Sequence, residues 1–233
     1  MTADDPIALI FDLDGTLIDS APDIHAAVNL MLSRRDIPPL TLPTVTSFVG
    51  NGLPKLVERV MHATEMDPAE FKSVTSEVLA DYDWVNGRMT RPYPGVVEAL
   101  GTLRDMGHPM SICTNKPTDP ALHILKKLDL AEFFHLLVGG DSLEVTKPRP
   151  EPLLAAIEGM DSTPDRALYI GDSEVDAETA SAAGVRFALF TMGYRKSPIE
   201  EMPHDARFDD FSELVGIVGS DHQDTRTASG AAP

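Results

Sequence analysis

The chain has 233 residues, of which 42% are apolar, so it is long enough for one α/β domain with a modest second lobe. Its 19 basic and 37 acidic residues give a formal net charge of −18, which argues against nucleic acid or an anionic membrane as a partner, because binding to either depends largely on Lys and Arg. An anionic substrate would need strong local positive charge, which a metal ion could supply.

The sequence contains one cysteine, Cys113, which lies in the apolar run Met110–Cys113 and is expected to be a small buried side chain rather than a reactive thiol. One cysteine allows no intramolecular disulfide, which suits a reducing compartment. No apolar run approaches the roughly 20 residues needed to span a bilayer, and Asp4 and Asp5 stand where a signal peptide would carry positive charge. We expect a cytoplasmic protein that is a monomer or a homodimer.

The first expected element is a buried strand over Ile7–Phe11. The segment after it has no strand pattern and carries apolar residues at helical spacing over Pro22–Arg34, Pro54–Ala63 and Pro68–Trp84. Such an insertion is too long for an ordinary connection between a strand and a helix. We therefore predict a small helical cap domain over residues 19–87, lying above the carboxyl end of the first strand.

Residues 1–18 and 88–219 are predicted to form an α/β core with a Rossmann-like parallel sheet. Short apolar runs followed by helical patterns are typical of βαβ units. Helices are expected at Leu153–Met160 and at Ala177–Ala183, where Gly184 is a natural stop. The polar tail, residues 220–233, is expected to be disordered. The strands expected after the cap are Pro109–Cys113, His135–Val138, Ala167–Ile170 and Phe187–Phe190.

Two carboxylates one residue apart, Asp12 and Asp14, follow the first strand directly. Because side chains two positions apart in a strand tend to point the same way, both acids are expected to face the same side. Gly15 then allows a tight turn and a close backbone approach. In open α/β sheets, ligands bind beyond the carboxyl ends of the strands, so we predict a site here rather than an Asp-Gly turn with solvated acids.

A second acidic pair, Asp172 and Asp176, follows a later strand. Asp176 falls in the first turn of the next helix, where the helix dipole favours an anion, so the pair alone could be an N-capping pattern. If the two strand ends are neighbours, however, Asp12, Asp14 and Asp172 repel one another strongly unless a cation neutralises them. Mg²⁺, a hard cation that prefers oxygen ligands, suits a site that must also hold a phosphate.

Two further segments offer groups that suit a phosphoryl ligand. Thr114, Asn115 and Lys116 follow another predicted strand and supply a hydroxyl, an amide and an ammonium. Lys147 lies in a proline-rich loop, and a lysine is a good point charge for phosphate. A lone lysine in such a loop is usually a solvated surface residue, so only its combination with the acids points to a site.

Together these segments resemble a known family over the range from about Ile7 to Leu214. The helical insertion is similar to that family's cap of the first type. In chain order, the segments that resemble the four motifs of the haloacid dehalogenase-like superfamily are Asp12-x-Asp14-Gly15-Thr16, Thr114, Lys147 and Gly171-Asp172-x-x-x-Asp176.

The resemblance implies a phosphatase that acts through a phospho-aspartate. Asp12 would attack phosphorus, while Asp14 would protonate the leaving oxygen and later activate water. This divides one slow hydrolysis into two easier displacements. Thr114 and Lys147 would hold the phosphoryl oxygens, and Lys147 would also offset the charge on Asp12.

The resemblance also implies a metal site. Asp12, Asp172 and the backbone carbonyl of Asp14 would hold Mg²⁺. Asp176 would orient these groups rather than bind the metal directly.

Within the superfamily, the chain is similar to bacterial phosphoglycolate phosphatases, although Thr191–Arg195 and Glu174-Val175 depart from the pattern of that group. The segments that carry this resemblance are Val49–Gly52, Glu58-Arg59, Thr114–Pro117, Gly139–Ser142 and Gly171–Ser173.

A substrate of that group carries a carboxylate as well as a phosphate, so the cap should offer donors or a cation. A glycine-rich helix start can present backbone N–H groups to an anion, and basic residues four apart share one helix face. The alternative is a glycine-rich helix start with solvated basic residues. The residues expected to bind substrate are Thr16 and Asn115 in the core and Gly50, Asn51, Gly52, Lys55 and Arg59 in the cap.

Three other functions share part of this pattern. A dehalogenase could use Asp12, but it has no leaving oxygen to protonate and no need of Mg²⁺, so Asp14 and Asp172 argue against it. A sugar-phosphate mutase would share every core motif, and only the cap and a phosphate-transfer assay would separate the two. A non-catalytic binding module would lack the nucleophile or the metal-binding acid. We therefore predict a Mg²⁺-dependent hydrolase of a small phosphorylated substrate, 2-phosphoglycolate, with another small phosphoester as the alternative.

Overall fold

The computed structural model of the chain describes the backbone of residues 6–228 and the side chains of residues 6–219. Its centre is a six-stranded parallel sheet with the strand order β5–β4–β1–β6–β7–β8. The bounds of its strands are β1 Ala8–Phe11, β4 Met110–Cys113, β5 Leu136–Val138, β6 Ala167–Gly171, β7 Arg186–Phe190 and β8 Ala206–Phe208.

The predicted Rossmann-like sheet is confirmed, and the five predicted strands are found to within one residue at each end. The sixth strand, β8, was not predicted. It is a three-residue edge strand, and its central residue, Arg207, is charged and exposed, so the segment has no apolar run.

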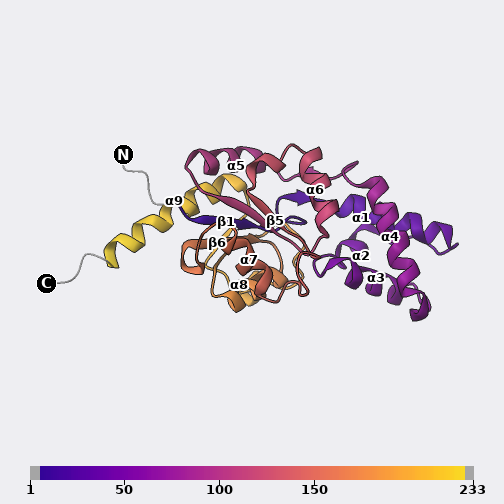
Figure 1. Cartoon of the computed structure of the whole chain (residues 1–233). Coiled ribbons are helices and arrows are strands. Elements are labelled where there is room, and N and C mark those ends of the chain that lie inside the picture. The colour runs from indigo at the N-terminus through magenta and orange to yellow at the C-terminus, as the bar shows by residue number, and fades with distance from the viewer. Residues whose placement is uncertain (1–5, 229–233) are drawn as a thin grey trace.

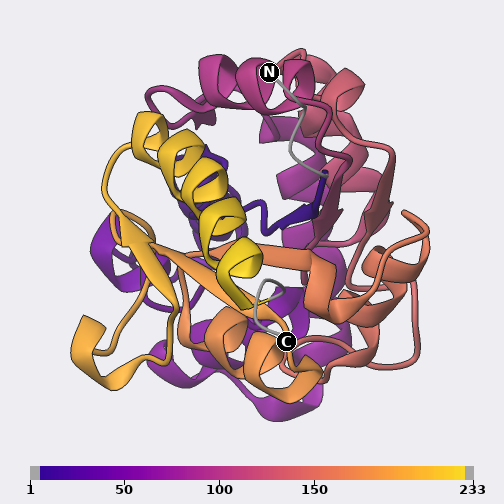
Figure 2. The same ribbon diagram turned by 90° about the vertical axis from the view of Figure 1, so that its left-hand side faces the viewer.

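Helices cover both faces of the sheet, as Figures 1 and 2 show. Their apolar sides form one buried cluster with each face, which explains why the strands are continuous apolar runs. Both helices predicted in this region are confirmed, and α8 ends at Gly184 in the left-handed conformation, with φ of 67°. One face carries α5 (Val96–Asp105), α6 (Thr118–Lys127) and α9 (Phe211–Ala228), and the other carries α7 (Glu151–Glu158) and α8 (Glu174–Ala183).

The cap is a bundle of helices at one end of the molecule, on the right in Figure 1. It has its own apolar core, separate from the two clusters of the sheet. The three predicted helical ranges are found, whereas the five-residue helix α2 was not predicted. The bounds are α1 Ala21–Arg34, α2 Leu42–Thr46, α3 Gly52–Ala63 and α4 Phe71–Val85. Short 3₁₀ helices lie at η1 Pro68–Glu70, η2 Ala131–Phe133, η3 Pro164–Arg166 and η4 Ile199–Glu201.

A two-stranded antiparallel ribbon, which we call the hinge ribbon, joins the cap to the core. It pairs β2 (Ile18–Asp19) with β3 (Arg91–Pro92), on the chain segments that lead into and out of the cap. The fully buried Asp23 in α1 reinforces the connection, because its carboxylate accepts hydrogen bonds from the backbone N–H groups of Gly87, Met89 and Thr90 at 2.8–3.0 Å. The domain limits at residues 19 and 87 remain a prediction.

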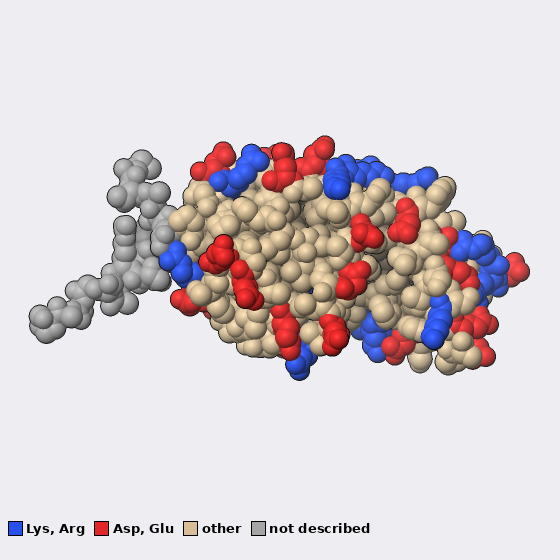
Figure 3. Space-filling view, in the orientation of Figure 1, with Lys and Arg blue, Asp and Glu red and all other residues tan. Residues whose placement is uncertain are grey.

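The C-terminal helix α9 extends to Ala228, into the segment 220–233 for which disorder was expected. The backbone of residues 220–228 is therefore helical, and residues 229–233 lie outside the described residues. Within the part of the chain that the structure describes, no helix is both long enough and apolar enough to cross a membrane. On the face shown in Figure 3, acidic side chains are scattered over the core with some basic ones among them, and at the cap end basic and acidic side chains lie side by side.

Candidate active site

The candidate site lies where three neighbouring strands end. β1 lies between β4 and β6 in the sheet, so Asp12, Thr114 and Asp172, which follow these strands, are brought to one edge. All three are buried. The two acidic strand ends are therefore neighbours, which was the condition for crowding their carboxylates.

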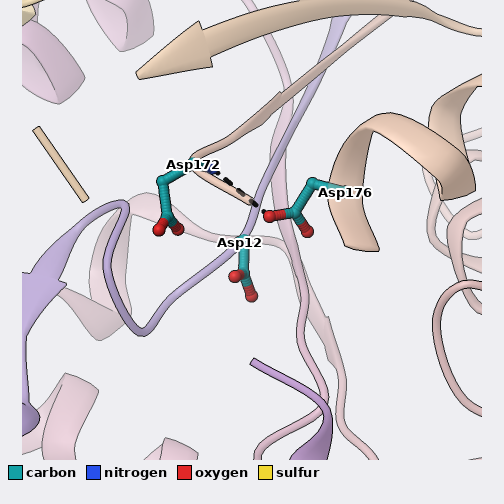
Figure 4. Close-up of side chains that lie close together, drawn as sticks. All are labelled: Asp12, Asp172 and Asp176. Carbon is teal, nitrogen blue, oxygen red and sulfur yellow. Dashed lines mark hydrogen bonds between the residues drawn. The ribbon is translucent and has the colours of Figure 1, made fainter. Parts of the chain in front are cut away.

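Three carboxylates gather at this edge. Oxygen atoms of Asp12, Asp172 and Asp176 lie within 4.8 Å of one another (Figure 4). Asp12 comes from the end of β1, whereas Asp176 extends from the first turn of α8. Carboxylates this close repel one another unless donors or cations compensate their charge.

Lys147 supplies part of that compensation. Its buried ammonium lies 2.9 Å from Asp12 Oδ1 and 2.7 Å from Asp176 Oδ1, and it donates a hydrogen bond to the Tyr169 hydroxyl at 2.8 Å. Burial alone would lower the pKa of Lys147, but Asp12 and Asp176 outweigh it and raise the pKa above its ordinary value. The lysine is therefore a fixed positive charge beside Asp12.

Asp176 is occupied by donors on both oxygens. Its Oδ1 receives hydrogen bonds from Lys147 and from Tyr169, and its Oδ2 receives them from the hydroxyl and N–H of Ser173 at 2.6 and 3.1 Å. The Ser173 hydroxyl caps the helix in return, which completes a capping box. Burial opposes ionisation of Asp176, but Lys147 and these donors lower its pKa. Such a carboxylate is suited to orienting its neighbours.

Asp172 receives one donor on each oxygen. The buried Thr16 hydroxyl donates to Oδ1 at 2.8 Å, and the backbone N–H of Tyr194 donates to Oδ2 at 2.6 Å. The turn after β1 must pass close by, since a Cβ at Gly15 would lie 2.6 Å from Asp172 Oδ2, and its φ of 92° also favours glycine. Thr16, which was expected to bind substrate, thus points at an acid of the cluster.

The cluster fits a divalent cation. Burial, together with the charge of Asp176, raises the pKa of Asp12 to about 6 against the opposing effect of Lys147, and burial with two like charges raises the pKa of Asp172. Apart from the Lys147 ammonium at 2.9 Å, no group among the described residues pairs with the buried Asp12 Oδ1. Asp12 and Asp172 thus combine raised pKa values with carboxylate lone pairs that accept no hydrogen bond, and a hard cation that binds oxygen stabilises such acids most.

Asp14 faces a partner that the sequence did not reveal. The Lys116 ammonium lies 2.9 and 3.1 Å from its two oxygens, and the Ser20 hydroxyl donates to Oδ1 at 2.5 Å. The buried Lys116 also donates to the hydroxyl of Tyr82 in cap helix α4 at 2.6 Å. Burial lowers the pKa of Lys116, but Asp14 and Tyr82 raise it to a net value above the ordinary one. Its charge is therefore committed to Asp14 rather than free for phosphate.

Thr114 and Asn115, both predicted at the site, differ in the hydrogen-bonding capacity that they have left for a substrate. The Thr114 hydroxyl accepts a long hydrogen bond from the Lys116 N–H at 3.2 Å and remains free to donate. The Asn115 amide donates to the carbonyls of Gly50 and Lys147 at 3.1 Å, and its oxygen accepts from the Lys147 N–H at 2.9 Å. Asn115 therefore joins the cap loop to the lysine loop and has little capacity left for a substrate.

Two pockets open on Asp12 and Asp14. The first is mostly apolar and lies under the cap, between Tyr82, Thr114, Asn115 and Lys116 and a set of apolar side chains that includes Ile24, Leu53, Leu56, Val78 and Leu79. The second is polar and lies between the cap loop at Val49–Asn51 and the core loops that contain Asp172, Glu174, Tyr194 and Lys196.

The predicted cap residues divide into two groups. Gly50, Asn51 and Gly52 line the pockets at the start of α3. Arg59 does not face the pockets, because it donates to the Phe48 carbonyl and to Asn51 Oδ1, both at 2.8 Å.

Lys55 lies outside the pockets. It is exposed and forms an ion pair with Glu58 at 2.8 Å, one turn along the same helix. The alternative of a solvated basic residue thus describes Lys55, while Arg59 holds the loop.

Tyr194 connects the acidic cluster to the hinge ribbon. Its backbone N–H binds Asp172, while its hydroxyl accepts hydrogen bonds from the N–H groups of Ser20 and Ala21 at 2.8 and 2.9 Å and donates to Asp19 Oδ1 at 2.7 Å. Sequence spacing could not reveal this link, although Tyr194 lies in one of the segments that depart from the family pattern.

Cys113 lies next to the site, at the end of β4. Its side chain is fully buried, and burial raises the pKa of its thiol to about 12, with Lys147 opposing. The prediction of a small buried side chain is confirmed.

Comparisons with known proteins agree with this geometry. The sequence model of the haloacid dehalogenase-like hydrolases matches residues 9–190. A phosphoglycolate phosphatase of Rhodobacter capsulatus is 48% identical over 91% of this chain and 96% of its own, and one of Rhodospirillum rubrum is 38% identical over 92% and 91%. A crystal structure of a predicted phosphoglycolate phosphatase from Haemophilus somnus superposes with a TM-score of 0.87 at 31% identity, covering 91% of this chain and 97% of that one.

The parallel sheet, the inserted cap and the acids at the ends of β1 and β6 define a capped α/β hydrolase. The chain belongs to the haloacid dehalogenase-like hydrolase family.

Proposed function

We propose that this protein hydrolyses a small phosphomonoester, 2-phosphoglycolate, to glycolate and phosphate. The observation that carries the proposal is the position of Asp12, whose carboxylate lies beside the Lys147 ammonium at 2.9 Å and opens on both pockets. The substrate is suggested by the relatives named phosphoglycolate phosphatase, which the chain matches along nearly all of their length.

In the proposed reaction an oxygen of Asp12 forms a bond to phosphorus while the bond from phosphorus to the leaving oxygen breaks. Asp14 gives that oxygen a proton and then takes one from the water that hydrolyses the aspartyl phosphate. Lys147 offsets the charge that gathers on the phosphoryl oxygens, and the Thr114 hydroxyl is free to donate to one of them. Lys116 and Ser20 hold the Asp14 carboxylate in place for both proton transfers.

The proposal includes Mg²⁺, held by Asp12, Asp172 and the Asp14 carbonyl, and a cytoplasmic setting. When bound, the ion supplies positive charge that neutralises the acids and polarises the phosphoryl group. Asp172 is kept in position from two sides: its backbone N–H donates a hydrogen bond to Asp176 Oδ2 at 3.3 Å, and its carboxylate accepts one from the Thr16 hydroxyl.

The apolar pocket favours a second candidate, a phosphoester whose leaving group is apolar and larger than glycolate. Its lining contains Leu53, Leu56 and Val78, which offer no partner for a carboxylate. A sugar-phosphate mutase remains the other alternative, since it would use the same core residues.

A kinetic screen separates these possibilities. The panel contains 2-phosphoglycolate, its neutral analogue 2-hydroxyethyl phosphate, phenyl phosphate as the apolar case, and a sugar 1-phosphate analysed for phosphate transfer. The proposal expects the highest kcat/KM for 2-phosphoglycolate with release of inorganic phosphate. A higher value for phenyl phosphate would favour the second candidate, and a transferred phosphate would identify a mutase.

A further inference from the structure

The polar pocket beside Asp12 contains one cation. Five acids line it, and Lys196 is the one basic residue among its described lining residues. The acids are Asp12, Asp14, Asp172, Glu174 and Glu178. Lys196 follows β7 in a core loop that faces the cap.

The Lys196 ammonium has no carboxylate partner within ion-pair distance among the described residues. It donates a long hydrogen bond of 3.3 Å to the carbonyl of Val49 in the cap loop. Glu174, which lines the same pocket, instead accepts hydrogen bonds from the backbone N–H groups of Lys196 and Ser197 on its Oε1. The ammonium is therefore free to bind a further anion.

A second cation lies behind the same cap loop. Arg59 donates to the Phe48 carbonyl and to Asn51 Oδ1, both neutral acceptors, so it too lacks a carboxylate partner among the described residues. The pKa of Lys196 lies below its ordinary value, because partial burial and the charge of Arg59 lower it more than the charge of Glu174 raises it. Two cations that repel each other across one loop leave a place where an anion is favourable.

The two lysines that contact Asp12 and Asp14 are already committed. Lys147 is paired with Asp12 and Asp176, and Lys116 is paired with Asp14. Neither is free for a second anionic group of the substrate. Lys196 is free, and it shares a pocket with the residue that is proposed to attack phosphorus.

We propose that Lys196 is the specificity residue that binds the substrate's carboxylate, with the loop at Gly50 and Asn51 closing over it. Arg59 is a positioning residue that holds this loop. The inference rests on the proposed function and adds the direction of the substrate: the phosphate lies at Asp12, and the carboxylate points into the polar pocket rather than into the apolar one.

The test is the ratio of kcat/KM for 2-phosphoglycolate to that for 2-hydroxyethyl phosphate, which replaces the carboxylate by an alcohol. Lys196→Met keeps an unbranched side chain that is one atom shorter and removes its charge. One charged contact contributes about 1.5–3 kcal/mol, so the ratio should fall by about 10- to 150-fold. The neutral substrate should keep its rate to within about twofold, and Lys196→Arg should restore part of the ratio.

Lys55→Met is the matched control, because it removes the same charge from an exposed ion pair outside both pockets. Its ratio should equal that of the wild type. An equal fall in Lys55→Met and Lys196→Met would mean that net charge, not a contact, sets the ratio, and would overturn the inference.

Failure of the inference is distinguishable from failure of the proposed function. A high wild-type ratio that Lys196→Met preserves overturns the role of Lys196 and leaves 2-phosphoglycolate as the substrate. A wild-type ratio near one rejects 2-phosphoglycolate. In that case the kcat/KM ratio of 3-phosphoglycerate to glycerol 3-phosphate is measured for the wild type and for Lys196→Met. An equal ratio in the two proteins would also overturn the inference.

Discussion

Lys147, which contacts Asp12, and Lys196, which lines the same pocket as Asp12, are held in different ways. Lys147 is buried and makes three close contacts, with Asp12, Asp176 and the Tyr169 hydroxyl. Lys196 is exposed, and its ammonium donates one long hydrogen bond to a cap carbonyl. The first is fixed before any substrate arrives, whereas the second is free to take up a partner.

The different surroundings of the two lysines suit different roles, one in the chemical step and one in substrate selectivity. A group that must stabilise developing charge works best when it is already in place, because nothing then has to reorganise during the reaction. A group that recognises one substrate among several can lie at a rim where the cap and core meet. In this chain Lys147 is paired within the core, whereas Lys196, which has no carboxylate partner among the described residues, lies between the core and the cap.

The largest expected effect is that of Asp12→Asn, which tests the core side of the comparison. The amide keeps the shape of the carboxylate but removes the attacking charge, so kcat should fall by at least about 10³-fold. Circular dichroism and thermal unfolding should show an intact fold. Retention of more than a few percent of the wild-type turnover would reject the phospho-aspartate.

Replacing each of the two lysines, Lys147 and Lys196, by Met should change the free energy of unfolding by very different amounts. Lys147→Met leaves Asp12 and Asp176 buried without their cation, which should lower the free energy of unfolding by about 3–5 kcal/mol. Lys196→Met breaks no ion pair and should change it by no more than about 0.5 kcal/mol. Urea unfolding of the two variants measures both values, and similar losses would show that Lys147 is not the fixed charge described above.

Metal binding should strengthen as pH rises, because the Asp12 carboxyl must lose its proton before it binds a cation. Its pKa is raised from 3.8 to about 6, so the stability it contributes to the metal-free protein is complete below about pH 4 and is lost as pH rises through 6. A cation binds the ionised form, so the increase in Tm on adding Mg²⁺ should be larger at pH 7 than at pH 5.

Asp12→Asn is the control for this measurement, since it removes one of the two metal-binding acids with a raised pKa and should weaken the dependence on pH. In the wild type, exhaustive chelation should also abolish turnover, and added Mg²⁺ should restore it. Turnover that is indifferent to the chelator would contradict the metal site and favour other chemistry.

A smaller effect than that of Lys147→Met is expected at Tyr194, which links the core to the cap. Tyr194→Phe keeps the ring and the N–H that binds Asp172, but removes the hydroxyl that binds Asp19, Ser20 and Ala21. Loss of these hydrogen bonds should lower the free energy of unfolding by about 1–3 kcal/mol. KM should rise more than kcat falls, because the hinge ribbon and not the acidic cluster loses support; the reverse pattern would place the hydroxyl's effect in the chemical step.

Much of the core could be predicted because its signals are local. Continuous apolar runs identified five strands, and each acid of the cluster follows a strand directly or lies in the next helical turn. Parallel strands then bring such residues to one edge of the sheet, although the strand order that makes β1 and β6 neighbours came from the structure. The capping role of Asp176 was likewise visible in its distance from the end of β6.

The cap side could not be predicted in the same way, because its contacts depend on how loops approach one another. Lys116 pairs with Asp14 across 102 positions of sequence, and Lys196 reaches Val49 across 147. Spacing placed Lys55 and Arg59 together on one helix, yet one forms a surface ion pair and the other binds its own loop. Partners of this kind follow from the path of the chain and not from any local pattern.

The hinge ribbon has an evolutionary consequence. The segments that enter and leave the cap are hydrogen-bonded to each other at Ile18–Asp19 and Arg91–Pro92, so the two ends of the insertion lie side by side. An insertion with adjacent ends can be lengthened, shortened or exchanged without moving the strands of the host domain. The core can thus keep its chemistry unchanged while descendants of one ancestor acquire new caps, and with them new substrates, by recombination at this single junction.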